Sequence, residues 1–143
     1  MDNILETSDL EKYIKDIIQE KLKKYSQCDV KFSVNFERGN KGDMDGEYVY
    51  SSSTGYYYLY LERGQIENKK RTENLFDIVY WSLKEYIFEL TMDYAKKNRN
   101  NAEDFRRILF GKELEIWASI GQNLYMKRKQ EIEEILIDNP YSD

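Results

Sequence analysis

The order in which apolar periodicities follow one another limits the fold of this chain more than any other feature. Apolar residues recur at helical spacing from Leu10 to Leu22, alternate with polar residues from Val30 to Phe36, and return to helical spacing from Leu75 onward. Helix-forming and strand-forming segments are therefore grouped, and they do not alternate as they do in α/β folds. This grouping predicts an α+β fold, with a small antiparallel three-stranded sheet between an N-terminal helix and three C-terminal helices that pack on it.

The first predicted helix covers residues 8–25. Ser8-Asp9-Leu10-Glu11 has the form of a capping box, in which the serine oxygen accepts an amide and the glutamate reaches back. A long helix is predicted to follow the strands, with Thr72 as its cap and an apolar stripe that ends at Tyr94.

Two shorter helices are predicted to complete the chain. The first is expected to be capped by Asn101, and Gly121 is expected to separate it from the second. The second should cover residues 124–137, because a helix has to end before Pro140.

Three strands are predicted, over residues 30–37, 47–50 and 56–63, with an exposed glycine-rich loop at 38–46 and a polar connection at 64–71. The third predicted strand is rich in tyrosine on both faces, so we expect both faces to be contacted. Core packing is the first interpretation of these tyrosines. A sheet edge covered by a helix and an aromatic binding face are the alternatives.

The length of 143 residues suits a single domain that comprises residues 1–143. The N-terminus lacks the basic stretch and apolar run of a secretory signal, and no segment approaches a membrane span, which predicts a cytoplasmic protein. The single cysteine, Cys28, cannot form an internal disulfide, and we expect it to be an inert thiol. The sequence does not predict an oligomeric state.

Charge and composition exclude several classes of function. With 22 basic and 27 acidic residues the net charge is −5, the wrong sign for a protein that neutralises phosphates, so we expect no nucleic-acid partner. The chain has no histidine, which removes the commonest general base and metal ligand. No phosphate-binding glycine motif occurs, and we expect no cofactor and no metal.

Some chemistry stays open on the sequence alone. The acidic loop at residues 43–47 superficially resembles a calcium loop but lacks the third early ligand and the glutamate at the twelfth position. Paired carboxylates could form an acid and base pair if they met in space, and the candidates are Glu62, Glu85, Glu89, Asp104, Glu113 and Glu115. Arg63, Arg106 and Arg107 are predicted to form structural ion pairs between helix and sheet with Glu62 and Asp104, ahead of a substrate clamp.

Residues 56–143 contain a series of short motifs in a particular order and spacing: Tyr58-Leu-Tyr-Leu-Glu62-Arg63-Gly64, Thr72, Tyr80-Trp81, Asn98-Arg99, Asp104-x-Arg106-Arg107-x-x-Phe110 and Ile135-Leu136-x-x-Asn139-Pro140-Tyr141-x-Asp143. In the order and spacing of these motifs the chain resembles the immunity protein 63 family of bacterial polymorphic-toxin systems. This resemblance implies a small cytoplasmic, non-enzymatic antidote that binds and blocks a cognate toxin domain, delivered by a competing cell or made by its own.

The matched positions have the character of scaffold, so we expect the toxin-binding surface outside them. The predicted partner-binding residues are acidic and aromatic positions of the loop and the following strand, where they could meet a basic toxin: Asp43, Asp45, Glu47, Tyr48 and Tyr50. A general cytoplasmic adaptor domain is the main alternative function. A carboxylate-based enzyme is the weaker alternative, and it would need two close acids in a deep pocket.

Overall fold

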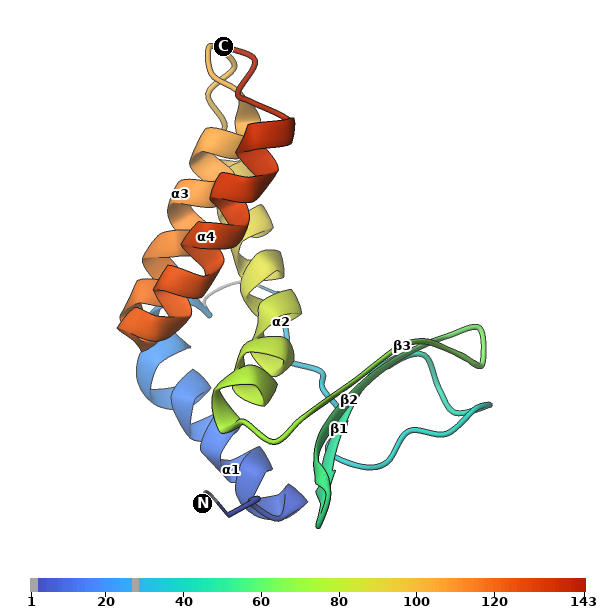
Figure 1. The fold of residues 1–143 in the computed structure, drawn as a ribbon. Helices are drawn as coiled ribbons and strands as arrows, with labels where there is room; N and C mark the ends of the chain where they lie inside the picture. Colours follow the sequence, from blue (N-terminus) through green and yellow to red (C-terminus); the bar gives the residue numbers. More distant parts are fainter. Residues whose placement is uncertain (1–2, 27–28) are drawn as a thin grey trace. The chain divides into compact units, whose positions relative to one another are not determined.

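A computed structural model describes residues 3–26 and 29–143. Within these residues, an N-terminal helix is followed by a three-stranded antiparallel sheet and then by three helices. Figure 1 shows how these elements follow one another along the chain. The predicted α+β class is confirmed. The chain divides into two compact units. Unit 1 comprises residues 1–18 and 31–86, and unit 2 comprises residues 19–30 and 87–143. A single domain stays a prediction, and Cys28 lies outside the described residues.

Helix α1 (Thr7–Ile17) continues into a π-helical turn, η1 (Ile18–Leu22), and a 3-10 turn, η2 (Lys23–Tyr25), so the helical stretch ends where the sequence predicted. The predicted capping box is wrong. The helix starts one residue before Ser8, and its N-cap, Glu6, makes no side-chain capping hydrogen bond. The neighbouring Thr7 instead uses its Oγ1 to accept a 3.0 Å hydrogen bond from the Ser51 amide, so the sheet and not a local box holds this end.

The sheet has the order β1-β2-β3, with β1 at Gly46–Ser52, β2 at Gly55–Glu62 and β3 at Gln65–Thr72. Both connections are two-residue hairpin turns. In the second turn Arg63 has φ 54° and Gly64 has φ 74°. Consecutive left-handed residues give a turn twist that matches the twist of the flanking strands, which is why glycine is favoured here.

Two of the three predicted strands, at residues 47–50 and 56–63, are confirmed as β1 and β2. The first predicted strand, at residues 30–37, is wrong, and the third strand of the sheet is β3. Residues 30–37 form no strand, and Asn35 alone makes a bridge, to Tyr48. The alternation there reflects burial without backbone pairing, since Phe32 packs edge-on against Tyr86 with ring centroids 5.6 Å apart. The predicted polar connection at 64–71 is mostly β3, an edge strand largely exposed on both faces, which therefore shows no apolar alternation.

Helix α2 (Leu75–Lys97) supplies its first half to unit 1 and its second half to unit 2. Its cap is Asn74, whose Oδ1 accepts a 2.8 Å hydrogen bond from the Phe76 amide. The prediction of Thr72 as the cap is wrong, because the Thr72 hydroxyl donates to Asp77 and accepts from the Asn74 amide instead.

Helix α3 (Phe105–Ile120) begins after Asp104, so the predicted cap at Asn101 is also wrong. Gly121 separates α3 from α4 (Gln122–Asp138), as predicted. Helix α4 ends two residues before Pro140, in agreement with the limit that proline sets.

Each unit contains its own apolar cluster. In unit 2 the buried residues are Ala95, Leu109, Phe110 and Ile132. In unit 1 one face of the sheet buries Tyr48, Leu59 and Leu61, and the opposite face buries Val49 and Tyr56. Both faces of the tyrosine-rich strand are therefore contacted, as the sequence predicted. Among the helices of the described residues, none is long and apolar enough to cross a membrane.

Candidate partner-binding surface

The loop of residues 38–45 is held in place by contacts with the β2–β3 turn and with β1. The Gly42 amide donates a 2.8 Å hydrogen bond to the Gly64 carbonyl, and the Arg63 amide donates a 2.8 Å bond to Asp45 Oδ1. Gly39 lies so close to β1 that a Cβ there would come within 2.7 Å of the Tyr48 ring. The loop therefore has a defined backbone path, which preserves the spacing of its side chains.

The three predicted acidic residues lie on or beside this loop. Asp43 is exposed and accepts a 2.8 Å hydrogen bond from the Asn40 amide, which closes a local turn. Asp45 is exposed and accepts the Arg63 amide. Glu47, half-buried on β1, accepts a 2.7 Å bond from the Tyr58 hydroxyl. Each carboxylate is thus positioned by a hydrogen bond.

The two predicted tyrosines are less accessible than the acids. Tyr48 is only 3% exposed, and its hydroxyl donates a 2.6 Å hydrogen bond to the Met44 carbonyl. Its side chain is therefore covered by the loop and helps to hold the loop in place. Tyr50 is half-buried and stacks on Tyr57 with ring centroids 4.9 Å apart, while the Arg38 guanidinium lies 5.7 Å from its ring. A partner could touch the rim of Tyr50 but not the buried ring of Tyr48.

Two further acids extend this group, and we call the set Glu37, Asp43, Asp45, Glu47 and Glu62 the acidic surface. Burial, together with the charges of Asp43, Glu37 and Asp45, raises the pKa of Tyr48 above its ordinary value of 10.0. The charge of Glu62 is the main cause of a raised pKa at Tyr60, with Asp45 and Glu47 adding to it. The tyrosines thus lie in a negative potential.

Met44 is 83% exposed and stands between Asp43 and Asp45. An exposed methionine can adapt its shape to an apolar contact, so the acidic surface also offers one flexible apolar side chain. Sequence reasoning did not join Glu62 to the loop because it counted Glu62 among the matched positions with the character of scaffold. The predicted hairpin of residues 47–50 with 56–63 was the available signal, since the pairing of Gly46 with Leu61 brings Glu62 beside the end of the loop.

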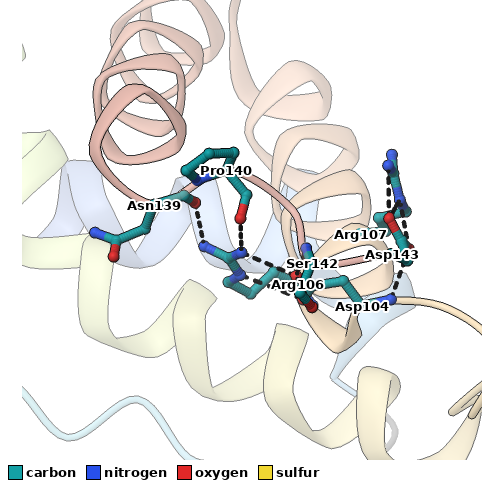
Figure 2. A network of polar contacts seen from close by, with 7 residues as sticks. All are labelled: Asp104, Arg106, Arg107, Asn139, Pro140, Ser142 and Asp143. Atoms are coloured by element: carbon teal, nitrogen blue, oxygen red, sulfur yellow. Dashed lines mark hydrogen bonds and ion pairs between the residues drawn. The ribbon is translucent and has the colours of Figure 1, made fainter.

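In unit 2, Arg106 and Arg107 join the start of α3 to the end of the chain, as Figure 2 shows. Arg106 pairs with Asp104 at 2.9 Å and donates to the carbonyls of Asn139 and Pro140. Arg107 pairs with Asp143 at 2.8 Å. The predicted structural ion pairs exist for both arginines, but their partners are not on the sheet, which corrects the expected helix-to-sheet link.

Two of the acids considered for catalysis in unit 2, Glu113 and Glu115, lie against cations. Glu113 is 1% exposed and its Oε1 lies 3.1 Å from Arg128 Nε, which joins α3 to α4. Glu115 pairs with Lys112 at 2.7 Å. The hydrogen bond from Lys112 lowers the pKa of Glu115 below its ordinary value. Within the described residues, no three potential metal ligands gather in one place.

Unit 1 also has an open groove of about 1180 Å³, lined by the segment before α1, the β1–β2 turn and the residues before α2. Its lining includes two acids, Glu6 and Glu73, and three serines, Ser51, Ser52 and Ser53. None of the six carboxylates proposed for an acid and base pair lines this groove.

Comparison with known proteins gives one family. No curated protein and no solved structure matches the chain. The model of the family described as immunity protein 63 matches residues 52–134, from the end of β1 into α4. Loop 38–45 and most of β1 lie before the matched segment. Because the match covers more than half of the 143 residues, this chain belongs to the immunity protein 63 family.

Proposed function

We propose that this chain is a cytoplasmic immunity protein that binds a cognate bacterial toxin domain and blocks it without chemistry of its own. The observation that carries this proposal is the match of residues 52–134 to the immunity protein 63 family. Membership implies a toxin as partner, and inhibition by binding needs only a complementary surface.

The acidic surface is our proposed point of contact. Asp43, Asp45 and Glu62 are exposed, and the loop that carries the first two is fixed by the bonds from Gly42 and to Asp45. A fixed loop loses less conformational entropy on binding than a free one. Loop 38–45 lies before the segment that the family model matches. This position suits a contact surface that varies between family members with different toxins.

Electrostatics suggests how the contact acts. A toxin that cleaves nucleic acid carries a basic cleft for phosphates, and an acidic blocker is attracted to it through long-range charge. Association should then slow as ionic strength rises, because salt at physiological strength largely screens the attraction between exposed charges that lie more than about 8 Å apart.

The test is co-expression of this chain with the C-terminal domain of the toxin encoded beside it. Cell survival and co-purification of the two proteins are expected. Asp43→Lys combined with Glu62→Lys should abolish rescue and weaken binding by at least about tenfold, because two attractive charges become repulsive.

The matched control makes the same charge change in unit 2, at exposed positions of α4: Glu133→Lys with Glu134→Lys. This control should rescue growth like the wild type. If both double variants lose binding equally, net charge and not the acidic surface governs the interaction. If the wild type neither rescues growth nor binds, the proposed function is wrong.

A further inference from the structure

The two edges of the sheet in unit 1 differ. Along β1 the outer edge is partly occupied, since the Asn35 amide donates to the Glu47 carbonyl at 2.9 Å and the Val49 amide donates to the Asn35 carbonyl at 2.9 Å. On the other side, within the described part of the chain, β3 pairs with β2 alone. Residues 65–69 and Arg71 are exposed. The open edge is therefore that of β3.

The backbone groups at this edge can be identified from the register. The two-residue turn after Ser52 pairs Gly55 with β1, so alternate residues of β2, Tyr56 and Tyr58, direct their backbone groups to β3. Their partners, Thr72 and Lys70, face inward. The residues between and beside them, Lys69 and Arg71, direct their N–H and C=O outward, where an added strand would find them.

The charge of β3 favours an acidic partner segment over a second copy of this chain at the open edge. The second half of β3 reads Lys69-Lys70-Arg71 in a chain whose net charge is −5. The Lys69 Nζ lies 5.9 Å from the Tyr57 ring, and the Lys70 Nζ lies 5.2 Å from the Trp81 ring. A second copy paired antiparallel about Lys70 would bring Lys69 of one copy opposite Arg71 of the other, which disfavours self-association in that register. An acidic extended segment would meet opposite charges instead.

The edge also adjoins the acidic surface. β3 starts directly after the turn whose Arg63 amide binds Asp45, and it ends at the cationic residues. The strand thus runs from a negative end to a positive end, which favours one orientation of a bound segment.

We propose that the outer edge of β3 binds an extended segment of the cognate toxin as an added β-strand, with acidic side chains of that segment beside Lys69 and Arg71. The proposal rests on the proposed function, because its partner is the same toxin domain. Main-chain hydrogen bonds from Lys69 and Arg71 supply affinity, while the cationic side chains select the sequence that binds.

The test separates backbone from side chain at one position. Lys69→Pro removes an outward N–H without removing a bond of the β2–β3 ladder, and proline is tolerated at such edge positions. Lys69→Ala is the matched control, since it removes the charge and keeps the N–H. Affinity for the toxin domain should fall at least about tenfold further in the proline variant than in the alanine variant.

A second measurement needs no variant. Amide hydrogen exchange in the wild-type complex should slow at Lys69 and Arg71, because their N–H groups become hydrogen-bonded. If the toxin binds and is neutralised while these amides exchange at the free rate, the β3 proposal is overturned and the proposed function stands. Protection in the purified chain alone, with the mass of a dimer, would assign the edge to a second copy and also overturn it. If the toxin domain does not bind at all, both proposals are lost.

Discussion

The two units differ in where their charged groups find partners. In unit 2, Glu113 meets Arg128 in the interior, and Arg106 and Arg107 bind acids and carbonyls at the end of the chain. In unit 1, the carboxylates of Asp43 and Asp45 stay exposed. These ion pairs of unit 2 thus connect α3 to α4 and to the end of the chain, whereas the two acids of unit 1 face solvent.

This difference suggests a division between scaffold and contact surface. Ion pairs inside a helical unit fix its geometry, and the charges that form them are not available to a partner. Exposed acids on a fixed loop and outward backbone groups on an open strand edge have the opposite character. Their interactions with a toxin contribute free energy only when the toxin binds. We therefore expect substitutions in unit 2 to change stability and those on the surface of unit 1 to change toxin binding.

The largest expected effect comes from Arg128→Met in unit 2. The variant would leave Glu113, 1% exposed, without the cation at 3.1 Å, and breaking a buried pair in this way costs about 3 to 5 kcal/mol. Urea denaturation of the purified protein should show this loss in the free energy of unfolding.

The control replaces both partners, as Glu113→Leu with Arg128→Met. An apolar pair of similar volume avoids the unpaired charge, so we expect most of the lost stability to return. If the single variant is as stable as the wild type, the pair is not a structural element of unit 2 and the contrast between the units is weakened.

The second prediction compares a glycine-to-alanine substitution in unit 1 with one in unit 2. Gly39→Ala would place a Cβ 2.7 Å from the Tyr48 ring and displace the loop, at a cost of about 1 to 3 kcal/mol, with weaker toxin binding. Gly111→Ala, on α3, meets nothing within 4 Å and should stabilise unit 2 by about 0.5 to 1 kcal/mol.

Thermal unfolding and toxin affinity of the two variants give the readout. If Gly39→Ala lowers stability and weakens toxin binding while Gly111→Ala raises stability and leaves binding unchanged, the contrast between scaffold and contact surface is sharpened. Equal affinity for Gly39→Ala and wild type would show that the loop path is irrelevant to binding.

The sequence predicted the helices of both units better than the sheet. Apolar stripes, Gly121 and Pro140 fixed the approximate limits of α3 and α4, because these signals act locally. The helix caps were predicted less well. Thr72 and Asn101 are good capping residues, yet the structure uses Asn74 and Asp104. Several polar residues stand before each of these helices, and local sequence does not choose between them.

The sheet was harder because burial and pairing are separate properties. Residues 30–37 alternate since Phe32 packs on Tyr86, although their backbone forms only one bridge. β3 lacks alternation since most of it is exposed on both faces. For the candidate site, Asp43 and Asp45 were predictable as exposed loop acids. The burial of Tyr48 was not, because it depends on the covering loop and the close approach of Gly39.

Acid should affect unit 2 through its carboxylates. The hydrogen bond with Arg106 is the main cause of the lowered pKa of Asp104, and that with Arg107 is the main cause of the lowered pKa of Asp143. The unfolded chain then binds more protons than the folded one below the ordinary pKa of 3.8, so stability is full above that pH and falls as pH decreases. Asp104→Asn with Asp143→Asn should make the loss on acidification shallower, as measured by denaturation across acid pH.

Alkali should affect unit 1, through its tyrosines. Burial is the main cause of the raised pKa values of Tyr48 and Tyr58, and the charge of Glu62 is the main cause of the raised pKa of Tyr60. The folded form keeps these protons above the ordinary pKa of 10.0, so stability is full below that pH and decreases as pH rises beyond it. The hydrogen bond with Thr54 lowers the pKa of Tyr57, which acts in the opposite direction but at one tyrosine against three.

The two tryptophans allow each unit to be followed separately, since Trp81 belongs to unit 1 and Trp117 to unit 2. In protein labelled with fluorotryptophan, the fluorine NMR signal of Trp81 should lose its folded position first on alkalinisation, and that of Trp117 first on acidification. Both signals changing together at each extreme would mean that the units unfold as one body. The separation of scaffold and contact surface would then describe the distribution of charge alone, because the stability of the two units would be shared.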